Sequence, residues 1–273
     1  MPAALYLVAT PIGNLEDITL RALRVLREAD LIACEDTRQT GKLLAHFGIV
    51  DKHMVSYHGH NEAARTRELV AKLESGVTIA LVSDAGTPLV SDPGYRLVTA
   101  AIAAGIPVVP IPGASAVLGA LAAAGLPTEA FRFCGFLPPK QGQRKKALEA
   151  LRGEDCTLIF YEAPHRILDT LADLAGVYGD RPVVVARELT KLHEEFLRGT
   201  AEEVRIQLAG RPSVKGEITL IVGKGRTTAL PANSVEDAVR ELEQKGVPRM
   251  DAIKQVARER GLSKREVYSK VTG

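Results

Sequence analysis

Short apolar runs alternate with segments of helical periodicity along the N-terminal part of the chain, and this alternation restricts the fold most. The apolar runs occupy residues 4–10, 31–35, 53–58, 77–82 and 106–111. Segments with a helical repeat of apolar side chains lie between them, at residues 15–30, 38–48, 61–76 and 95–104. Because apolar strands that alternate with helices form parallel sheets covered on both faces, the pattern predicts an α/β domain.

A second series of the same kind follows residues 110–116, where two prolines and a glycine indicate a hinge. A helix of small residues is predicted at 116–126. The strands predicted after it are 131–136, 156–161, 182–187, 194–200 and 216–222, and the helices are 141–152, 165–177 and 201–209. The sequence therefore predicts two α/β domains, at residues 1–112 and 113–225. The cleft between two such domains is a favoured place for a small ligand.

The C-terminal segment, residues 231–273, is predicted to be a small helical extension of helix-turn-helix type after a linker at 223–234. Ser234 is expected to cap its first helix, and Gly246 and Gly261 to end the first and second helices. Ser263 is expected to cap the third helix, with Glu266 at the spacing of a capping box.

Charge and composition favour a protein of the cytoplasm. The net charge of +2 does not by itself indicate a nucleic-acid partner, although a balanced total can contain a local basic face. Three cysteines, an odd number, fit free thiols in a reducing compartment better than a disulfide framework. No leader peptide and no membrane span is expected, because the chain has neither a basic N-terminal region nor a long apolar stretch.

The loop at residues 82–94 combines two prolines, two glycines and two aspartates directly after a predicted strand. Asp84 and Asp92 could serve simply as turn formers, since aspartate side chains cap their own backbone. However, ligands of parallel sheets bind outside the carboxyl ends of the strands. The loop is also longer than a connection requires, so we expect it to bind a ligand.

Polar clusters follow several other predicted strands, at residues 34–38, 56–62, 160–166 and 186–195. Clusters at equivalent places in two domains indicate a shared polar cleft. A metal site is not expected, because His58 and His60 would face opposite sides of a strand and no third ligand accompanies them. The first loop, residues 10–14, lacks the glycines of a dinucleotide-binding turn.

Six motifs, in this order, resemble those of the bacterial ribosomal RNA small-subunit methyltransferase I family, which belongs to the tetrapyrrole methylase superfamily. They lie at residues 5–22, 33–38, 82–98, 110–116, 161–167 and 187–195. The resemblance runs almost from end to end and extends to the helical tail. It implies two α/β domains of the tetrapyrrole-methylase type, with S-adenosylmethionine bound in a bent conformation between them, and a homodimer.

The same resemblance implies which residues contact the cofactor. They are Pro11, Ile12, Gly13, Ser83, Asp84, Ala85, Gly86, Thr87, Ala114, Ser115, Ala116, Tyr161 and Ala186. Small side chains would let the backbone approach the adenine, and the Asp84 carboxylate would meet ribose hydroxyls or the cationic end. Asp92 is assigned to closing the turn.

The family reaction methylates the ribose 2′-oxygen of a cytidine in small-subunit ribosomal RNA. A 2′-hydroxyl is a poor nucleophile near neutral pH, so it must be positioned and at least partly deprotonated. Four general bases remain open, with the first two favoured: Glu35, Asp36, His58 and Glu188. The cations expected to hold RNA phosphates are Arg38, Arg166, Arg187, Lys191, Lys264, Arg265 and Lys270.

Two alternatives remain at this point. One is a C-methyltransferase of tetrapyrroles from the same superfamily, which leaves the basic tail and the motifs at 33–38 and 161–167 without a purpose. The other is a ribosomal RNA-binding assembly factor without catalysis, which leaves the cofactor-loop motifs without a purpose.

Overall fold

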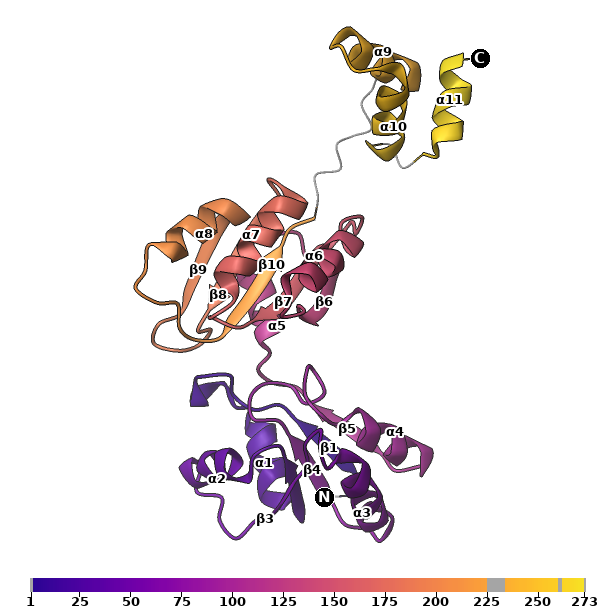
Figure 1. Ribbon diagram of the computed structural model, residues 1–273. Helices are drawn as coiled ribbons and strands as arrows, with labels where there is room; N and C mark the ends of the chain where they lie inside the picture. Colours follow the sequence, from indigo (N-terminus) through magenta and orange to yellow (C-terminus); the bar gives the residue numbers. More distant parts are fainter. Residues whose placement is uncertain (1, 225–233, 260–261, 273) are drawn as a thin grey trace. The chain divides into compact units, whose positions relative to one another are not determined.

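A computed structural model of the chain describes residues 2–224, 234–259 and 262–272. The chain divides into two compact units, residues 1–224 and residues 225–273. The first unit contains two sheets and the second is helical (Figure 1). None of the described helices is long and apolar enough to cross a membrane.

The first sheet is parallel throughout, with the strand order β3-β2-β4-β1-β5. Its strands are β1 (Leu5–Val8), β2 (Leu31–Cys34), β3 (His53–Ser56), β4 (Ile79–Val82) and β5 (Val108–Ile111). Helices α1 (Leu20–Glu28) and α2 (Thr37–His46) pack on one face, and α3 (Glu62–Glu74) and α4 (Tyr95–Ala103) on the other. The predicted parallel sheet covered on both faces is confirmed.

The predicted helix at residues 15–30 is wrong as a single element, because two capping side chains start two separate helices. Asn14 accepts a hydrogen bond from the backbone of Glu16 and begins a short 3-10 helix, η1 (Leu15–Asp17). Thr19 is extended and its hydroxyl accepts a hydrogen bond from the backbone N–H of Ala22, at 3.0 Å, which begins α1. The chain thus turns between the first loop and the helix.

The second sheet is mixed, with the strand order β6-β7-β10-β8-β9. Its strands are β6 (Phe131–Phe136), β7 (Thr157–Glu162), β8 (Pro182–Arg187), β9 (Glu195–Thr200) and β10 (Ile218–Val222). Only the β6–β7 pair is parallel, because β10 enters antiparallel between β7 and β8, and β9 returns directly along β8.

Helices cover both faces of this second sheet as well. Helices α6 (Gln141–Ala150), α7 (Ile167–Tyr178) and α8 (Ala201–Ala209) pack on one face. The small-residue helix α5 (Ala116–Ala124) packs on the other, with Ala120 against the sheet residues Ile159 and Ile221. The predicted boundary between residues 112 and 113 falls between β5 and α5 and stays a prediction.

The loops that matter for a ligand begin where β1, β2 and β4 end. Because these strands are parallel neighbours, their carboxyl ends lie at one edge of the sheet. Thr10 after β1 forms an isolated β-bridge with Gly86 after β4, which holds two of these loops together.

The second unit contains α9 (Val235–Gln244), α10 (Arg249–Glu259) and α11 (Lys264–Thr272). They share a small apolar core of Val235, Val239, Ala252, Ile253, Val256, Ala257 and Val267. The predicted caps at Ser234 and Ser263 are confirmed, and the Ser263 backbone N–H also donates to the Glu266 carboxylate at 2.7 Å. Gly246 follows α9 with a φ of +85°, as expected of a helix stop. Gly261 and the linker residues 225–233 lie outside the described residues.

Candidate functional site

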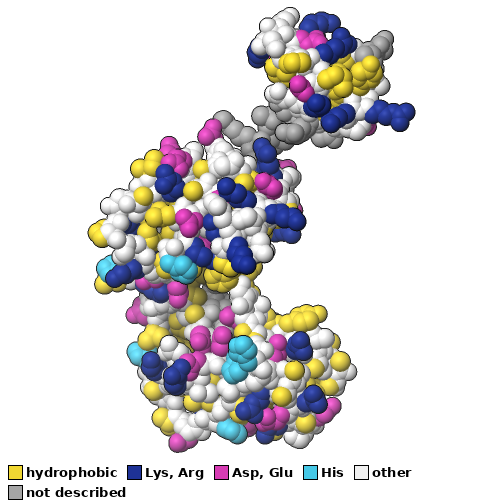
Figure 2. All heavy atoms as spheres, viewed as in Figure 1, with side chains coloured by type: hydrophobic (Ala, Val, Ile, Leu, Met, Phe, Trp, Pro, Cys, Tyr) yellow, Lys and Arg dark blue, Asp and Glu magenta, His cyan; other side chains and the backbone are white. Residues whose placement is uncertain are grey.

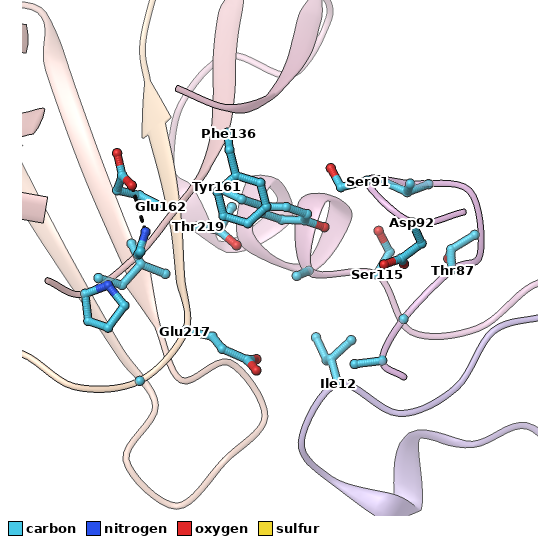
Figure 3. Close-up of a pocket in the computed structure, with 18 residues that line it drawn as sticks. Ile12, Thr87, Ser91, Asp92, Ser115, Phe136, Tyr161, Glu162, Glu217 and Thr219 are labelled. Atoms are coloured by element: carbon cyan, nitrogen blue, oxygen red, sulfur yellow. Dashed lines mark hydrogen bonds between the residues drawn. The ribbon is translucent and has the colours of Figure 1, made fainter. Parts of the chain in front are cut away.

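A cavity of about 350 Å³ lies between the loops of the first sheet and the strands β7 and β10 of the second (Figure 3). Seven of the residues predicted to contact the cofactor line it: Ile12, Ala85, Gly86, Thr87, Ser115, Ala116 and Tyr161. The second sheet and its loops contribute the opposite wall, which includes Phe136, Glu162, Gly216, Glu217 and Thr219. The structure thus brings together segments that are far apart in the sequence.

A second hollow, of about 490 Å³, adjoins the first and shares Ile12, Ala85 and Glu217 with it. The predicted residues Pro11, Gly13, Ser83 and Asp84 line this second hollow. One Asp84 carboxylate oxygen accepts a hydrogen bond from the backbone N–H of Asp36, at 3.1 Å. Asp84 therefore ties the loop after β4 to the loop after β2.

Two predicted contact residues lie outside the linings of both cavities. The Ala114 carbonyl oxygen accepts a hydrogen bond, at 3.2 Å, from the hydroxyl of Thr87, which lines the first cavity. Ala186 is fully buried in β8, where it pairs with Thr219 of β10. Because Thr219 lines the cavity, Ala186 is one strand away from it.

The loop at residues 83–94 is held in a strained conformation. The Ser83 hydroxyl lies within hydrogen-bond distance of the carbonyl oxygens of Ala85 and Gly86, at 3.3 and 3.4 Å. Leu89 and Ser91 have φ angles of +71° and +68°. Residues other than glycine rarely adopt this left-handed backbone conformation. Such strain costs on the order of 1–3 kcal/mol per residue and occurs where the surrounding structure fixes the chain, often at functional sites.

Three acidic residues, Glu35, Asp84 and Asp92, are close enough to influence one another. Burial, followed by the negative charges of Glu35 and Asp84, raises the pKa of the Asp92 carboxyl to about 6. Burial, followed by the charge of Asp84, also raises the pKa of Glu35. Asp92 lines the 350 Å³ cavity, beside Ser115 in Figure 3. Sequence reasoning assigned it only to closing the turn; the repeated Ser-Asp of the loop was the available signal.

The four proposed bases do not line the 350 Å³ cavity. Hydrogen bonds from Arg38 lower the pKa of Asp36 to about 2. A hydrogen bond from Lys191, followed by one from the Glu217 backbone, lowers the pKa of Glu188.

His58 has one ring nitrogen, Nε2, 3.2 Å from the Asn61 amide nitrogen. Its other ring nitrogen, Nδ1, is buried and has no hydrogen-bond partner in the described parts of the chain. Among those same parts, no cluster of three or more His, Cys, Asp or Glu residues could hold a metal ion.

The four cations predicted in the first unit all take part in ion pairs. Arg38 pairs with Asp36 at 2.7 Å, and its side chain remains 85% exposed. Arg166 pairs with the buried Glu162. The remaining pairs are Arg187 with Glu195 at 2.5 Å, and Lys191 with Glu188 at 2.9 Å and with Glu217 at 3.2 Å. Arg38 thus remains accessible to a phosphate, whereas the others hold loops of the second sheet. In the second unit, Lys264, Arg265 and Lys270 are exposed on α11.

The cavity suits a ligand with a flat ring, sugar hydroxyls and a positive charge. Its small residues Ala85, Gly86 and Ala116 leave room for a ring against the backbone. A Cβ atom added at Gly86 would lie 3.3 Å from Ile12 Cγ2 and would narrow this space. Thr87 and Ser115 offer hydroxyls, and Asp92 and Glu217 offer carboxylates. The residues present therefore fit S-adenosylmethionine.

Comparison with known proteins identifies the family. The sequence profile of the tetrapyrrole (corrin/porphyrin) methylases matches residues 4–205. The ribosomal RNA small subunit methyltransferase I of Halalkalibacterium halodurans is 53% identical over 275 residues, which cover 97% of this chain and 93% of that protein. The protein of the same name from a Synechocystis species is 50% identical, over 97% of this chain and 95% of that protein.

A crystal structure of uroporphyrin-III C-methyltransferase from Thermus thermophilus, in complex with S-adenyl homocysteine, has the same fold. Its TM-score is 0.55 at 23% identity, over 81% of this chain and 97% of that one. The profile match, the full-length identity and the paired sheets agree with one another. The chain belongs to the tetrapyrrole methylases and, within them, to the ribosomal RNA small subunit methyltransferase I family.

Proposed function

We propose that this chain transfers a methyl group from S-adenosylmethionine to the ribose 2′-oxygen of a cytidine in small-subunit ribosomal RNA. The observation that carries the proposal is the 53% identity, over 97% of the chain, with a protein named ribosomal RNA small subunit methyltransferase I. The cavity of about 350 Å³ between the two sheets agrees with it. S-adenosylmethionine supplies a methyl group on a positively charged sulfur.

Different residues of the cavity lining would bind different parts of the cofactor. Ala85, Gly86 and Ala116 present backbone and small side chains to the adenine, and the hydroxyls of Thr87 and Ser115 bind polar groups of the ribose. Carboxylates favour the cationic end of the cofactor through Coulomb attraction, which is strong in a partly buried site.

Asp92 is the base that we propose for the 2′-hydroxyl. Of the three acidic residues that line the cavity, Glu162 is paired with Arg166 and Glu217 with Lys191. Burial, followed by the charges of Glu35 and Asp84, instead raises the pKa of Asp92 to about 6, where a carboxylate is a better proton acceptor and is still ionised at neutral pH. Its oxygen would take the hydroxyl proton as the 2′-oxygen attacks the methyl group.

The earlier candidates receive different roles in this proposal. Glu35 raises the pKa of Asp92 by its charge. The low pKa of Asp36, about 2, makes it a poor base, and its side chain caps α2 by accepting from the backbone of Arg38. The lowered pKa of Glu188 and its bond to Lys191 suit a structural role in the loop after β8. His58 lies outside the lining of the cavity, with its Nε2 3.2 Å from the Asn61 amide nitrogen.

RNA phosphates would meet the exposed Arg38 and the tail cations Lys264, Arg265 and Lys270. Contacts of this kind position the RNA without reading its sequence. We also propose a homodimer that acts in the cytoplasm, on the strength of the family resemblance and of the ribosomal substrate. Light scattering of the purified protein tests the dimer: twice the chain mass of 29.3 kDa is expected, and the single mass would contradict it.

The activity is tested by incubating the protein with methyl-labelled S-adenosylmethionine and either unmodified small ribosomal subunits or uroporphyrinogen. We expect label in the RNA, recovered as 2′-O-methylcytidine after digestion to nucleosides. Label in uroporphyrinogen would instead support a tetrapyrrole methyltransferase. Label in neither, with the protein still bound to the subunit, would support an assembly factor without catalysis.

A further inference from the structure

Aromatic side chains are scarce in this chain, at 4% of residues, yet two of them line one wall of the cavity and a third packs against that pair. The ring of Tyr161 lies 4.9 Å from that of Phe133 and 5.6 Å from that of Phe136, between ring centroids. Tyr161 and Phe136 both line the cavity, and Figure 3 shows their rings together on its wall. Phe136 forms the outer end of this aromatic row, and 58% of it is exposed.

A β-bulge places Phe136 there. Phe133 pairs with Ile159 and Phe136 pairs with Tyr161, so β6 has one residue more than β7 between these pairs. Gly135, inside the bulge, has a φ of +65°, which glycine adopts without steric cost. In a regular strand, residues three apart point to opposite faces. The extra residue instead turns both phenylalanines toward the ring of Tyr161, as bulges beside active sites often re-aim a side chain.

The turn that follows Phe136 is held by two arginines. Arg166 donates to the carbonyl oxygen of Leu137 at 3.4 Å, and Arg144 donates to that of Pro139 at 3.2 Å. Each arginine is fixed in turn by a carboxylate that is only 2% exposed, Glu162 for Arg166 and Asp173 for Arg144. Phe136 is therefore an exposed aromatic ring on a rigid support, which lowers the entropy lost when a flat ligand stacks on it.

The segment that follows Phe136 in the sequence is rich in lysine. Lys140, the residue before α6, and Lys145 and Lys146 within that helix are exposed, although Lys145 also lies 3.6 Å from the Asp173 carboxylate. Figure 2 shows Lys and Arg side chains over the region where Figure 1 draws α6. Aromatic rings beside cations are the combination by which proteins hold single-stranded nucleic acids, with bases on the rings and phosphates on the cations.

We propose that Phe136 is a stacking platform for the base of the target nucleotide, which is extruded from the RNA, and that the lysines of α6 contact the adjoining phosphates. This inference rests on the proposed ribosomal RNA substrate. Methylation of the 2′-oxygen requires that the ribose of one nucleotide enters the cavity. Enzymes that act on a nucleotide within a folded nucleic acid extrude it and stack its base on aromatic or apolar side chains. Phe136 lies at the cavity wall, where such a base would rest beside the ribose.

The test compares Phe136→Ala with Phe136→Tyr and with Phe131→Ala. Phe131 is a matched control, because it belongs to the same strand and is 44% exposed but does not line the cavity. Phe136→Ala is expected to lower kcat/KM for small ribosomal subunits roughly 5- to 150-fold, the range of base–aromatic stacking. Phe136→Tyr should restore most of this loss, and Phe131→Ala should cause none. Calorimetry with S-adenosylhomocysteine should give the same affinity for all four proteins.

Two results would overturn the inference. One is an unchanged kcat/KM in Phe136→Ala, and the other is a weakened affinity for S-adenosylhomocysteine, which would mean that adenine stacks on Phe136. If the wild-type protein places no label in the subunits, the proposed function fails. The stacking platform is then tested with a single-stranded RNA that carries a fluorescent cytosine analogue. Binding to the wild-type protein should quench the emission of the analogue, and binding to Phe136→Ala should not. Equal quenching by the two proteins would refute the platform.

Discussion

The backbones of Thr10 and Gly86 hold each other by two reciprocal hydrogen bonds. The N–H of Thr10 donates to the Gly86 carbonyl oxygen at 2.9 Å, and the N–H of Gly86 donates to the Thr10 carbonyl oxygen at 3.0 Å. The Thr10 hydroxyl also donates to the carbonyl oxygen of Ser83 at 3.2 Å. The loop that follows β1 and the loop that follows β4 are thereby fixed to one another. Gly86 thus combines this bridge with a place in the lining of the 350 Å³ cavity.

Gly86→Ala should therefore weaken the binding of S-adenosylhomocysteine on the order of tenfold, because overpacking a tight site typically costs 1–3 kcal/mol. The added Cβ would lie 3.3 Å from Ile12 Cγ2, in the cavity lining. Gly125→Ala is the matched control, because the φ angles are similar, +81° and +74°, but nothing lies within 4 Å of a Cβ at Gly125. Both variants should lose some thermal stability through backbone strain, and Gly86→Ala alone should lose affinity. If calorimetry gave Gly86→Ala the same affinity for S-adenosylhomocysteine as Gly125→Ala and wild type, Gly86 would have no role in binding.

Asp92→Asn should lower the rate of methyl transfer about 10²- to 10⁴-fold, the usual contribution of a general base. In the wild-type protein, the rate should rise as the pH increases through about 6, where Asp92 loses its proton, and then level off. The variant should lack this rise. Glu74→Gln, on the exposed end of α3, serves as a charge-removing control. Single-turnover rates of methyl transfer, measured from pH 5 to 8, test this role. If Asp92→Asn kept the rate and the pH dependence of wild type, another group would accept the proton of the 2′-hydroxyl.

Asp92→Asn should also stabilise the fold, but only at pH values at which Asp92 of the wild-type protein is charged. The pKa of Asp92 is raised from 3.8 to about 6, so the folded protein keeps a proton that the unfolded chain loses between these values. The free energy of unfolding therefore falls as the pH rises through this window. Asp92→Asn should unfold at a higher temperature than wild type at pH 7.5 and at nearly the same temperature at pH 4. A gain of equal size at both pH values would contradict the raised pKa.

Replacing Lys264, Arg265 and Lys270 by alanine should weaken RNA binding in a salt-dependent way. Each lost phosphate contact reduces the slope of log affinity against log salt concentration by about 0.7 for single-stranded nucleic acid, so the slope should fall by about 2. The affinity for S-adenosylhomocysteine should not change, because the residues that line the cavity belong to the unit at 1–224. Filter binding to small-subunit RNA at several salt concentrations measures the slope. The same slope in both proteins would show that α11 is not an RNA-docking element.

The sequence predicted what depends on local periodicity and on capping. The apolar runs of the first sheet and the caps at Ser234 and Ser263 follow from patterns within a few residues. The predicted helix at 15–30 was wrong because Thr19 starts a new helix, a choice that the apolar repeat alone does not reveal. The antiparallel entry of β10 into the second sheet depends on which strands become neighbours, and no local pattern encodes that.

The site was harder to predict because its chemistry depends on distances between segments. Asp92 resembles a turn former in the sequence, and its pKa is raised only by what the fold supplies: burial first, then the nearby charges of Glu35 and Asp84. Arg166 resembles a phosphate-binding residue, and only the fold pairs it with the buried Glu162. Phe136 carried no signal beyond the rarity of aromatic residues, because the bulge at Gly135 that turns it toward Tyr161 exists only in the paired strands.

A crystal structure of the full chain with S-adenosylhomocysteine tests the central claim most directly, namely that the methyl donor binds in the cavity between the two sheets. The account predicts electron density for a bent ligand against Gly86, Ser115 and Tyr161, with its sulfur open toward Asp92. A crystal that shows this cavity without ligand density, and the ligand ordered at another surface of the protein, would contradict it.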